Sequence, residues 1–234
     1  MERKKSFTLL ELLVVMGIIG ILVSILLPSL KKARHVAKIA VCHSNLKQHG
    51  TALVAYMTSG NGRFPIDTSL NDQQMYYYSG KKGKYHITKS VDSDQKFLNK
   101  FMGYTDKGLD VEVAKCPLDN DKIQRLNETV YDFLGSSYMA ASRPEAWCPD
   151  VMDWSSKSTL NLAQVIRPSK MGILFAFGAW HKSAAPMWYS DDMTVHGRKG
   201  FEFLFVDGHV SDQKIPISGY GLTHSSSDVT FLNN

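Results

Sequence analysis

The sequence predicts an α+β fold, in which a long N-terminal helix packs on an antiparallel β-sheet domain toward the C-terminus. Two observations predict the helix: an apolar run at residues 7–27, and an apolar stripe of helical spacing that follows it as far as Met57. A third observation predicts the sheet, because strand-like segments lie on both sides of the pair Asp207-Gly208. A helix followed by a run of strands is the element order of an α+β protein.

The first element is the apolar run of residues 7–27, in which Glu11 is the only ionisable residue. At the rise of an α-helix these residues span about 31 Å, close to the thickness of a bilayer core. We therefore expect this segment to cross a membrane. A carboxylate at that depth costs on the order of a few kcal/mol unless a partner satisfies it, so Glu11 is predicted to have a functional partner.

A short basic leader precedes Phe7, Glu11 is the fifth residue counted from Phe7, and Pro28 is the twenty-second. This arrangement resembles the processing signal of the type IV pilin-like proteins, a family that includes the pseudopilins of type II secretion. One position differs, because Ser6 stands where that family usually has Gly.

The resemblance implies a pilin-like fold and a defined processing route. A prepilin peptidase would cut between Ser6 and Phe7, and the new amine of Phe7 would be methylated. Glu11 would then pair with the Phe7 amine of an adjacent subunit, and Pro28 would kink the helix. The implied partners are the prepilin peptidase and methylase, the membrane, inner-membrane assembly machinery, and further copies or related pilin-like subunits in a filament.

The same resemblance implies a single-pass protein of the bacterial inner membrane, with its C-terminal domain outside the cytoplasm and its filament in the periplasm or at the cell surface. An ordinary signal anchor and a secretory signal peptide are the alternatives. The signal peptide is disfavoured because its apolar core is usually about 7–15 residues long, and residues 25–28 are a poor match to its cleavage site. Basic residues flank the span on both sides, so the positive-inside rule alone does not decide the orientation.

The net charge is small for a protein that binds nucleic acid. The chain has 27 basic and 22 acidic residues, and removal of residues 1–6 leaves 24 and 21. This excess is too weak to indicate a nucleic-acid partner, and no interleaving of aromatic and basic residues supports one.

Beyond the membrane span, the helix is expected to continue as an amphipathic segment. Its stripe consists of Val36, Ile39, His43, Leu46, Gly50, Leu53 and Met57. The turn-forming residues 59–62 end it, so one helix is predicted from about Phe7 to Thr58. The predicted organisation is a leader at 1–6, a transmembrane and assembly helix at 7–29, its amphipathic continuation at 30–60, and an exported globular α+β domain at 61–234.

The globular part begins with polar sequence and ends with strands. Residues 63–110 predict loops with short elements, in which Tyr76-Tyr77-Tyr78 is either half-buried or a recognition surface, and residues 81–84 form a solvated turn. Residues 171–177 and 201–206 predict strands. The pair Asp207-Gly208 predicts a type I′ hairpin turn, because both of its central positions need positive φ.

Three fragments of this part carry a second resemblance, to a pilin-like subfamily related to the major pseudopilins. They are Cys42 with Asn45-Leu46-Lys47-Gln48, Cys116-Pro117-Leu118-Asp119, and His196 followed by Asp207-Gly208. Ten residues separate His196 from Asp207, one more than is usual in that subfamily.

Ionisable residues are concentrated near the C-terminus: His181, His196, His209, Asp191, Asp192 and Asp207. They could form an acid–base pair or hold a metal, although no zinc-type spacing and no nucleophile turn is present. Asp191, Asp192 and Asp207 are calcium candidates, because carboxylates in a turn suit a hard cation and some major pseudopilins hold calcium in their C-terminal loops. The simpler interpretation makes Asp207 a turn former, so no cofactor is the expectation and calcium the alternative.

The three cysteines Cys42, Cys116 and Cys148 cannot all pair within one chain. Outside the cytoplasm one disulfide is plausible, and either Cys116–Cys148 or Cys42–Cys116 would serve.

These observations together predict a structural subunit that is not an enzyme: a pseudopilin of a type II secretion system or of a related type IV filament. The alternative is a membrane-tethered or minor-pilin domain that binds a polysaccharide or a surface. Exposed tryptophans in a groove near Trp147, Trp154, Trp180 and Trp188 would favour that alternative.

Overall fold

The computed structural model describes residues 8–60, 62–65, 78–84, 91–119, 128–140, 152–153, 158–159, 161–165, 168–176, 201–213, 217–218 and 221–222. Contacts divide the chain into two compact units, residues 1–40 and residues 41–234. The boundaries predicted for the leader, the membrane helix and the exported domain stay predictions.

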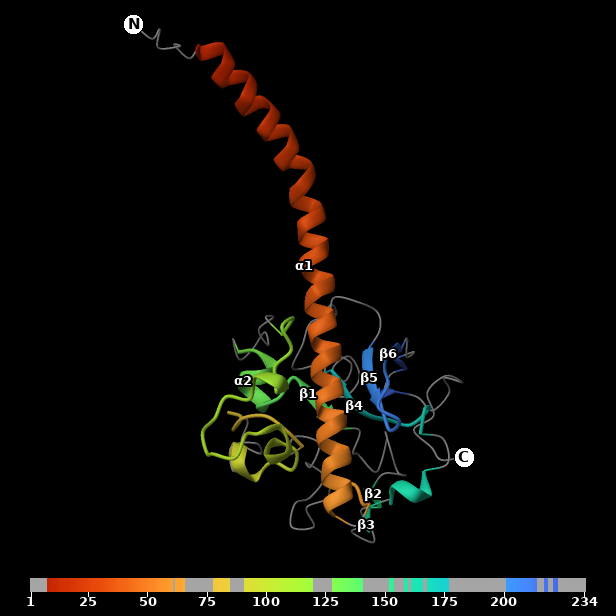
Figure 1. The fold of residues 1–234 in the computed structure, drawn as a ribbon. Helices are drawn as coiled ribbons and strands as arrows, with labels where there is room; N and C mark the ends of the chain where they lie inside the picture. Colours follow the sequence, from red (N-terminus) through yellow and green to blue (C-terminus); the bar gives the residue numbers. More distant parts are fainter. Residues whose placement is uncertain are drawn as a thin grey trace, which may run out of the picture. The chain divides into compact units, whose positions relative to one another are not determined.

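The first unit contains the N-terminal part of helix α1, which spans Leu9–Ser59 and confirms the long helix expected from the sequence. Every side chain from Thr8 to Arg34 is exposed, and most of them are apolar. Among the described residues, α1 is the one helix long and apolar enough to cross a membrane. Pro28 lies inside the helix, which continues through it along the curve visible in Figure 1.

The second unit begins on the same helix, and there α1 buries one face. Leu46, Gly50, Leu53 and Met57 of the predicted stripe are buried. Ile39 of the stripe is also buried, whereas Val36, which was expected in the same stripe, is 57% exposed. The buried face is also wider than predicted and includes Cys42, Asn45, His49 and Ala52.

A four-stranded antiparallel sheet forms the centre of the second unit, in the order β1-β4-β5-β6. Its strands are β1 (Tyr138–Ala140), β4 (Gly172–Ala176), β5 (Phe201–Phe205) and β6 (Val210–Gln213). Two small sheets pair β2 (Met152–Asp153) with β3 (Ser158–Thr159) and β7 (Ile217–Ser218) with β8 (Gly221–Leu222). The α+β class is therefore confirmed, with β4 and β5 inside the segments predicted as strands.

Helix α1 packs closely against β5, beside which it runs in Figure 1. The absence of a side chain at Gly50 permits this approach, because a Cβ there would lie 3.1 Å from Leu204 Cδ1. Glu202 and Leu204 are two residues apart on one strand, so they lie on the same face of the sheet. This face meets α1, while Phe203 and Phe205 are buried on the opposite face.

The hairpin predicted at Asp207-Gly208 joins β5 to β6, but its turn differs from the prediction. Gly208 N donates to Phe205 O at 2.9 Å, and Phe205 N donates to His209 O at 2.9 Å. The loop therefore has three residues, with Gly208 in the left-handed region at φ 85°. The prediction of a type I′ turn was wrong because Val206, whose N–H bonds to Met171 O, is held in the core and belongs to the loop.

In the described part of residues 63–110, short helices lie among loops and turns, in agreement with the predicted loops with short elements, and further short helices follow. They are η3 (Ser93–Gln95), η4 (Asn99–Met102), η5 (Glu112–Ala114) and α2 (Val130–Leu134), and η6 (Leu162–Gln164) follows later. Tyr78 of the tyrosine triplet is buried, its ring packs edge-on against Phe97, and its hydroxyl donates to Pro65 O. Tyr76 and Tyr77 lie outside the described residues.

The expected solvated turn at residues 81–84 is only partly solvated. Lys81 is half-buried, and its Nζ lies 2.7 Å from Asp132 Oδ1 and 3.2 Å from Asp110 Oδ1. The same ammonium lies over the Tyr131 ring. Hydrogen bonds and the charges of these two carboxylates raise the pKa of Lys81 despite its partial burial, which lowers it.

Candidate functional site

The first candidate site is the start of helix α1, where Glu11 already has a partner within its own chain. Thr8 N and Thr8 Oγ1 each donate to Glu11 Oε2 at 2.9 Å, and Glu11 N donates to Thr8 Oγ1 at 3.3 Å. This reciprocal arrangement is a capping box, which satisfies free backbone donors at a helix start. Sequence reasoning missed Thr8, although the spacing Thr-x-x-Glu was a usable signal. Ser6 and Phe7 lie outside the described residues, so the cleavage site stays a prediction.

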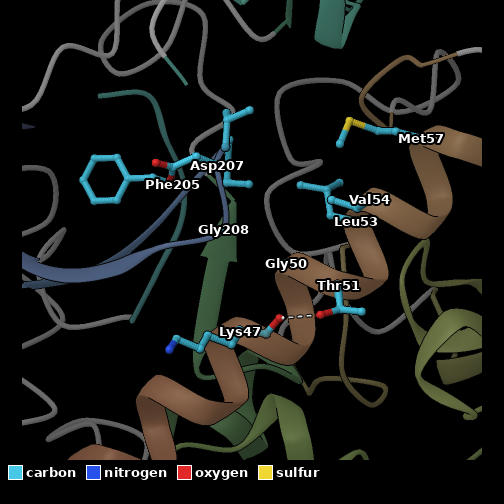
Figure 2. A pocket seen from close by; sticks show the side chains of 11 residues that line it. Lys47, Gly50, Thr51, Leu53, Val54, Met57, Phe205, Asp207 and Gly208 are labelled. Atoms are coloured by element: carbon cyan, nitrogen blue, oxygen red, sulfur yellow. Dashed lines mark hydrogen bonds between the residues drawn. The ribbon is translucent and has the colours of Figure 1, made fainter. Parts of the chain in front are cut away.

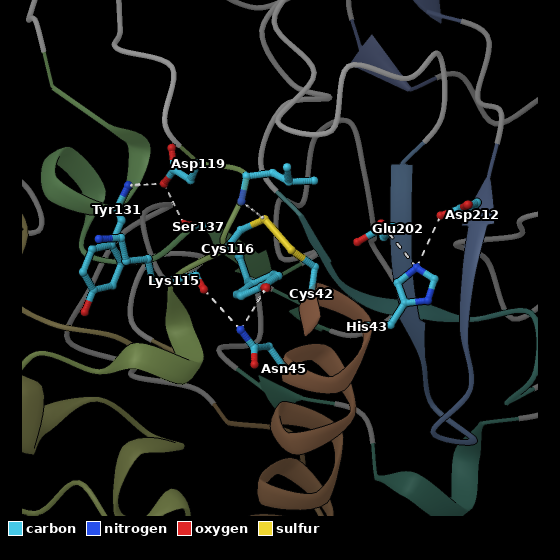
Figure 3. The surroundings of a disulfide bond; sticks show 12 residues. Cys42, His43, Asn45, Lys115, Cys116, Asp119, Tyr131, Ser137, Glu202 and Asp212 are labelled. Atoms are coloured by element: carbon cyan, nitrogen blue, oxygen red, sulfur yellow. Dashed lines mark hydrogen bonds and ion pairs between the residues drawn. A yellow bond between two sulfur atoms is a disulfide. The ribbon is translucent and has the colours of Figure 1, made fainter. Parts of the chain in front are cut away.

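The second candidate site is a disulfide between Cys42 of α1 and Cys116, shown in Figure 3. Its Cα atoms are 5.5 Å apart, it joins residues 74 positions apart, and both cysteines are fully buried. Beside it, Asn45 Nδ2 donates to Lys115 O at 3.1 Å and to Tyr138 Oη at 3.4 Å. Of the two pairings left open by the sequence, the structure forms Cys42–Cys116, and Cys148 lies outside the described residues.

Asp119 continues this linkage three residues beyond Cys116. Its buried carboxylate accepts hydrogen bonds from Val130 N at 3.1 Å, Tyr131 N at 2.7 Å and Ser137 Oγ at 2.6 Å. Burial raises the pKa of Asp119, and these hydrogen bonds oppose the rise only in part. The fragment Cys116–Asp119 therefore joins α1 at one end and the start of α2 at the other.

A buried histidine lies one turn of α1 beyond Asn45. His49 Nδ1 lies 2.8 Å from Asn45 O, and His49 Nε2 lies 2.7 Å from Ser79 Oγ. Because a carbonyl can only accept, Nδ1 carries the proton and Nε2 accepts from the Ser79 hydroxyl. Burial lowers the pKa of His49 to about 4, so this side chain is neutral at pH 7 and acts in packing.

The predicted calcium group is described only at Asp207. This carboxylate lies in the exposed hairpin turn, where Asp207 Oδ1 accepts from His209 N at 3.1 Å and lies 2.5 Å from His209 Nδ1. The His209 ring stacks on Phe205 with centroids 4.2 Å apart. These contacts agree with a turn-forming role for Asp207. The remaining candidates lie outside the described residues: Asp191, Asp192, His181, His196 and the tryptophans at 147, 154, 180 and 188.

Figure 2 shows a pocket of about 460 Å³ between α1 and the hairpin turn. Its wall is mostly apolar, with Val54 and Met57 on the helix side and Ile173 and Val206 on the sheet side. The Thr51 hydroxyl donates to Lys47 O and is thus engaged within the helix. The polar residues of its lining are Lys47, Thr51 and Asp207.

A third group combines residues that sequence reasoning did not connect. His43 Nε2 lies 3.3 Å from Glu202 Oε1 and 3.5 Å from Asp212 Oδ1, as Figure 3 shows. His43 had been predicted only as a member of the apolar stripe. No local pattern could have found this group, because the chain brings α1 to β5 and β6 only on folding.

Comparison with known proteins bears on the first of these sites. Residues 1–27 match the family described as the prokaryotic N-terminal methylation motif. The N-terminus carries a prepilin-type signal. No curated protein and no solved structure matches this chain. The match covers the leader and the apolar part of α1, and it supports a pilin-like, membrane-anchored subunit that is processed as a prepilin.

Proposed function

We propose that this chain is a pseudopilin of a type II secretion system or the corresponding subunit of a related type IV filament. The match of residues 1–27 to the methylation motif carries the proposal. Helix α1 supports it, since one uninterrupted helix runs from an exposed apolar segment into a globular α+β unit. Such a subunit acts by assembly rather than by catalysis.

The proposed processing follows from this role. A prepilin peptidase cuts between Ser6 and Phe7, and the new Phe7 amine is methylated. The leader is then cytoplasmic and the second unit lies outside the inner membrane. The buried Cys42–Cys116 disulfide supports this topology, because structural disulfides persist in oxidising compartments such as the periplasm and are rare in the cytosol.

Assembly uses the exposed apolar face of α1. Lipid covers these side chains while the subunit is a membrane protein, and neighbouring helices cover them in the filament. Thr8 satisfies the Glu11 carboxylate before assembly, with two donors at 2.9 Å. The Phe7 amine of an adjacent subunit then adds a positive charge, which a carboxylate in an apolar environment binds more strongly than a neutral donor.

Substitution of Glu11 tests the assembly role. Glu11→Ala is expected to insert and be cut normally, but to reduce the yield of sheared filaments at least tenfold, because the Phe7 amine loses its counter-charge. Glu112→Ala is the matched control, since Glu112 is an exposed glutamate of the second unit. A normal filament yield from Glu11→Ala would contradict the proposed role.

A further inference from the structure

Three potential metal ligands from three elements converge beside the disulfide (Figure 3). They are His43 on α1, Glu202 on β5 and Asp212 on β6, and their ligand atoms all lie within 4.8 Å of one another. Glu202 and Asp212 are register partners in the antiparallel pair β5–β6, so they project from the same face of the sheet. That face is the one covered by α1.

An ordinary hydrogen bond does not account for this geometry. Both carboxylates approach the same ring nitrogen, Nε2 of His43, which carries at most one proton. Their distances of 3.3 and 3.5 Å exceed the usual length of a charged hydrogen bond, about 2.7–2.9 Å. Within the described part of the chain, this buried nitrogen makes no hydrogen bond of acceptable geometry.

The same distances fit a tetrahedral metal ion. Zinc lies about 2.0–2.1 Å from histidine nitrogen and carboxylate oxygen, so two ligands on a tetrahedron are separated by about 3.3–3.4 Å. The observed separations from Nε2 are 3.3 Å to Glu202 Oε1 and 3.5 Å to Asp212 Oδ1.

We propose that His43, Glu202 and Asp212 bind a divalent transition-metal ion of the zinc class. An imidazole ligand selects such an ion over calcium, which takes oxygen ligands. The side chains of Asp212 and His43 are 46% and 32% exposed, while that of Glu202 is 3% exposed. The site thus opens to solvent on one side, where water takes the fourth position.

The ion would join the β5–β6 hairpin to α1 at the residue that follows Cys42. The disulfide links α1 to the Cys116 segment, so two neighbouring residues of the helix attach it to two different parts of the second unit. The ion therefore stabilises the unit near the point where it begins. This inference does not depend on the proposed pilin function.

Zinc binding by the full-length chain in detergent tests the proposal. The protein is stripped with a chelator, incubated with zinc chloride, freed of unbound metal by gel filtration, and analysed for metal content and thermal unfolding. Asp212→Asn and His43→Asn each remove one ligand. His209→Asn is the matched control, because His209 is an exposed histidine beside one carboxylate, Asp207. The test compares the zinc content of the variants with that of the wild type, because other histidines and Cys148 can also bind zinc.

The wild type and His209→Asn are expected to retain one more zinc ion per chain than Asp212→Asn and His43→Asn. Zinc should raise the unfolding temperature of the first two proteins only. Equal zinc content in all four proteins would overturn the proposal, as would binding of calcium but not zinc. Asp212→Asn tests the metal site even if His43→Asn does not fold. This variant should fold, because it replaces a half-exposed side chain with one of the same size.

Discussion

Removal of the Cys42–Cys116 disulfide should destabilise the second unit strongly. The bond closes a loop between residues 74 positions apart, and chain-entropy scaling for a loop of this length gives about 4 kcal/mol of stabilisation. Domains of this size are typically stable by only about 5–15 kcal/mol, so the loss is a large fraction of the total. The double variant Cys42→Ala/Cys116→Ala is the direct perturbation.

The assay is urea unfolding of the full chain in detergent, followed by near-ultraviolet circular dichroism. Both cysteines are fully buried, so their replacement by Ala leaves small voids that cost about 1 kcal/mol each. Reduced wild-type protein keeps the sulfur atoms of both cysteines, so it shows the cost of losing the disulfide without the cost of the voids. Cys148→Ala is the control for the third thiol. A loss of unfolding free energy below about 1 kcal/mol on reduction, or an equal loss in Cys148→Ala, would contradict this prediction.

Three further predictions concern buried positions of the second unit. His49 has a pKa of about 4 in the folded state against 6.5 in the unfolded state. Its neutral form therefore adds fully to the free energy of unfolding above pH 6.5, and this contribution is lost as pH falls toward 4. This loss reaches about 3 kcal/mol. When urea unfolding is measured between pH 7 and pH 4, the free energy of unfolding should therefore fall less with pH in His49→Gln than in the wild type. Gly50→Leu should cost about 1–3 kcal/mol in the same assay, because the Cβ already lies 3.1 Å from Leu204, whereas Gly17→Leu, with open space around it, should leave the second unit unchanged. Asp119→Ala should cost about 2–4 kcal/mol, since three donors lose their acceptor, and unchanged amide-exchange protection of α2 in this variant would contradict that role.

Local sequence patterns predicted the elements of the fold that depend on neighbours along the chain. Helix α1 was predictable because its apolar run and its stripe repeat at helical spacing, and β4 and β5 because they are short apolar runs. Val36 and Ile39 both fit the same stripe, but Val36 is exposed and Ile39 is buried, and the spacing alone does not distinguish them. The hairpin turn was misassigned by one residue, since Val206 is held by a hydrogen bond to the distant Met171.

The candidate sites depend on contacts that sequence spacing does not contain. Thr8 and Glu11 are the exception, because a capping box is a local pattern. The sequence could not decide between the pairings Cys42–Cys116 and Cys116–Cys148. The approach of His43 to Glu202 and Asp212 was equally hidden, because it requires α1 to lie on one face of a sheet whose strands come much later in the chain.

The N-terminus of the mature chain distinguishes a processed prepilin from an uncut membrane protein. The protein is co-expressed with an active prepilin peptidase, and its intact mass and N-terminal sequence are measured. The mature chain is expected to begin at Phe7 and to carry a methyl group on its amine. A chain that still begins at Met1, while a control prepilin is cut in the same cells, would contradict this expectation.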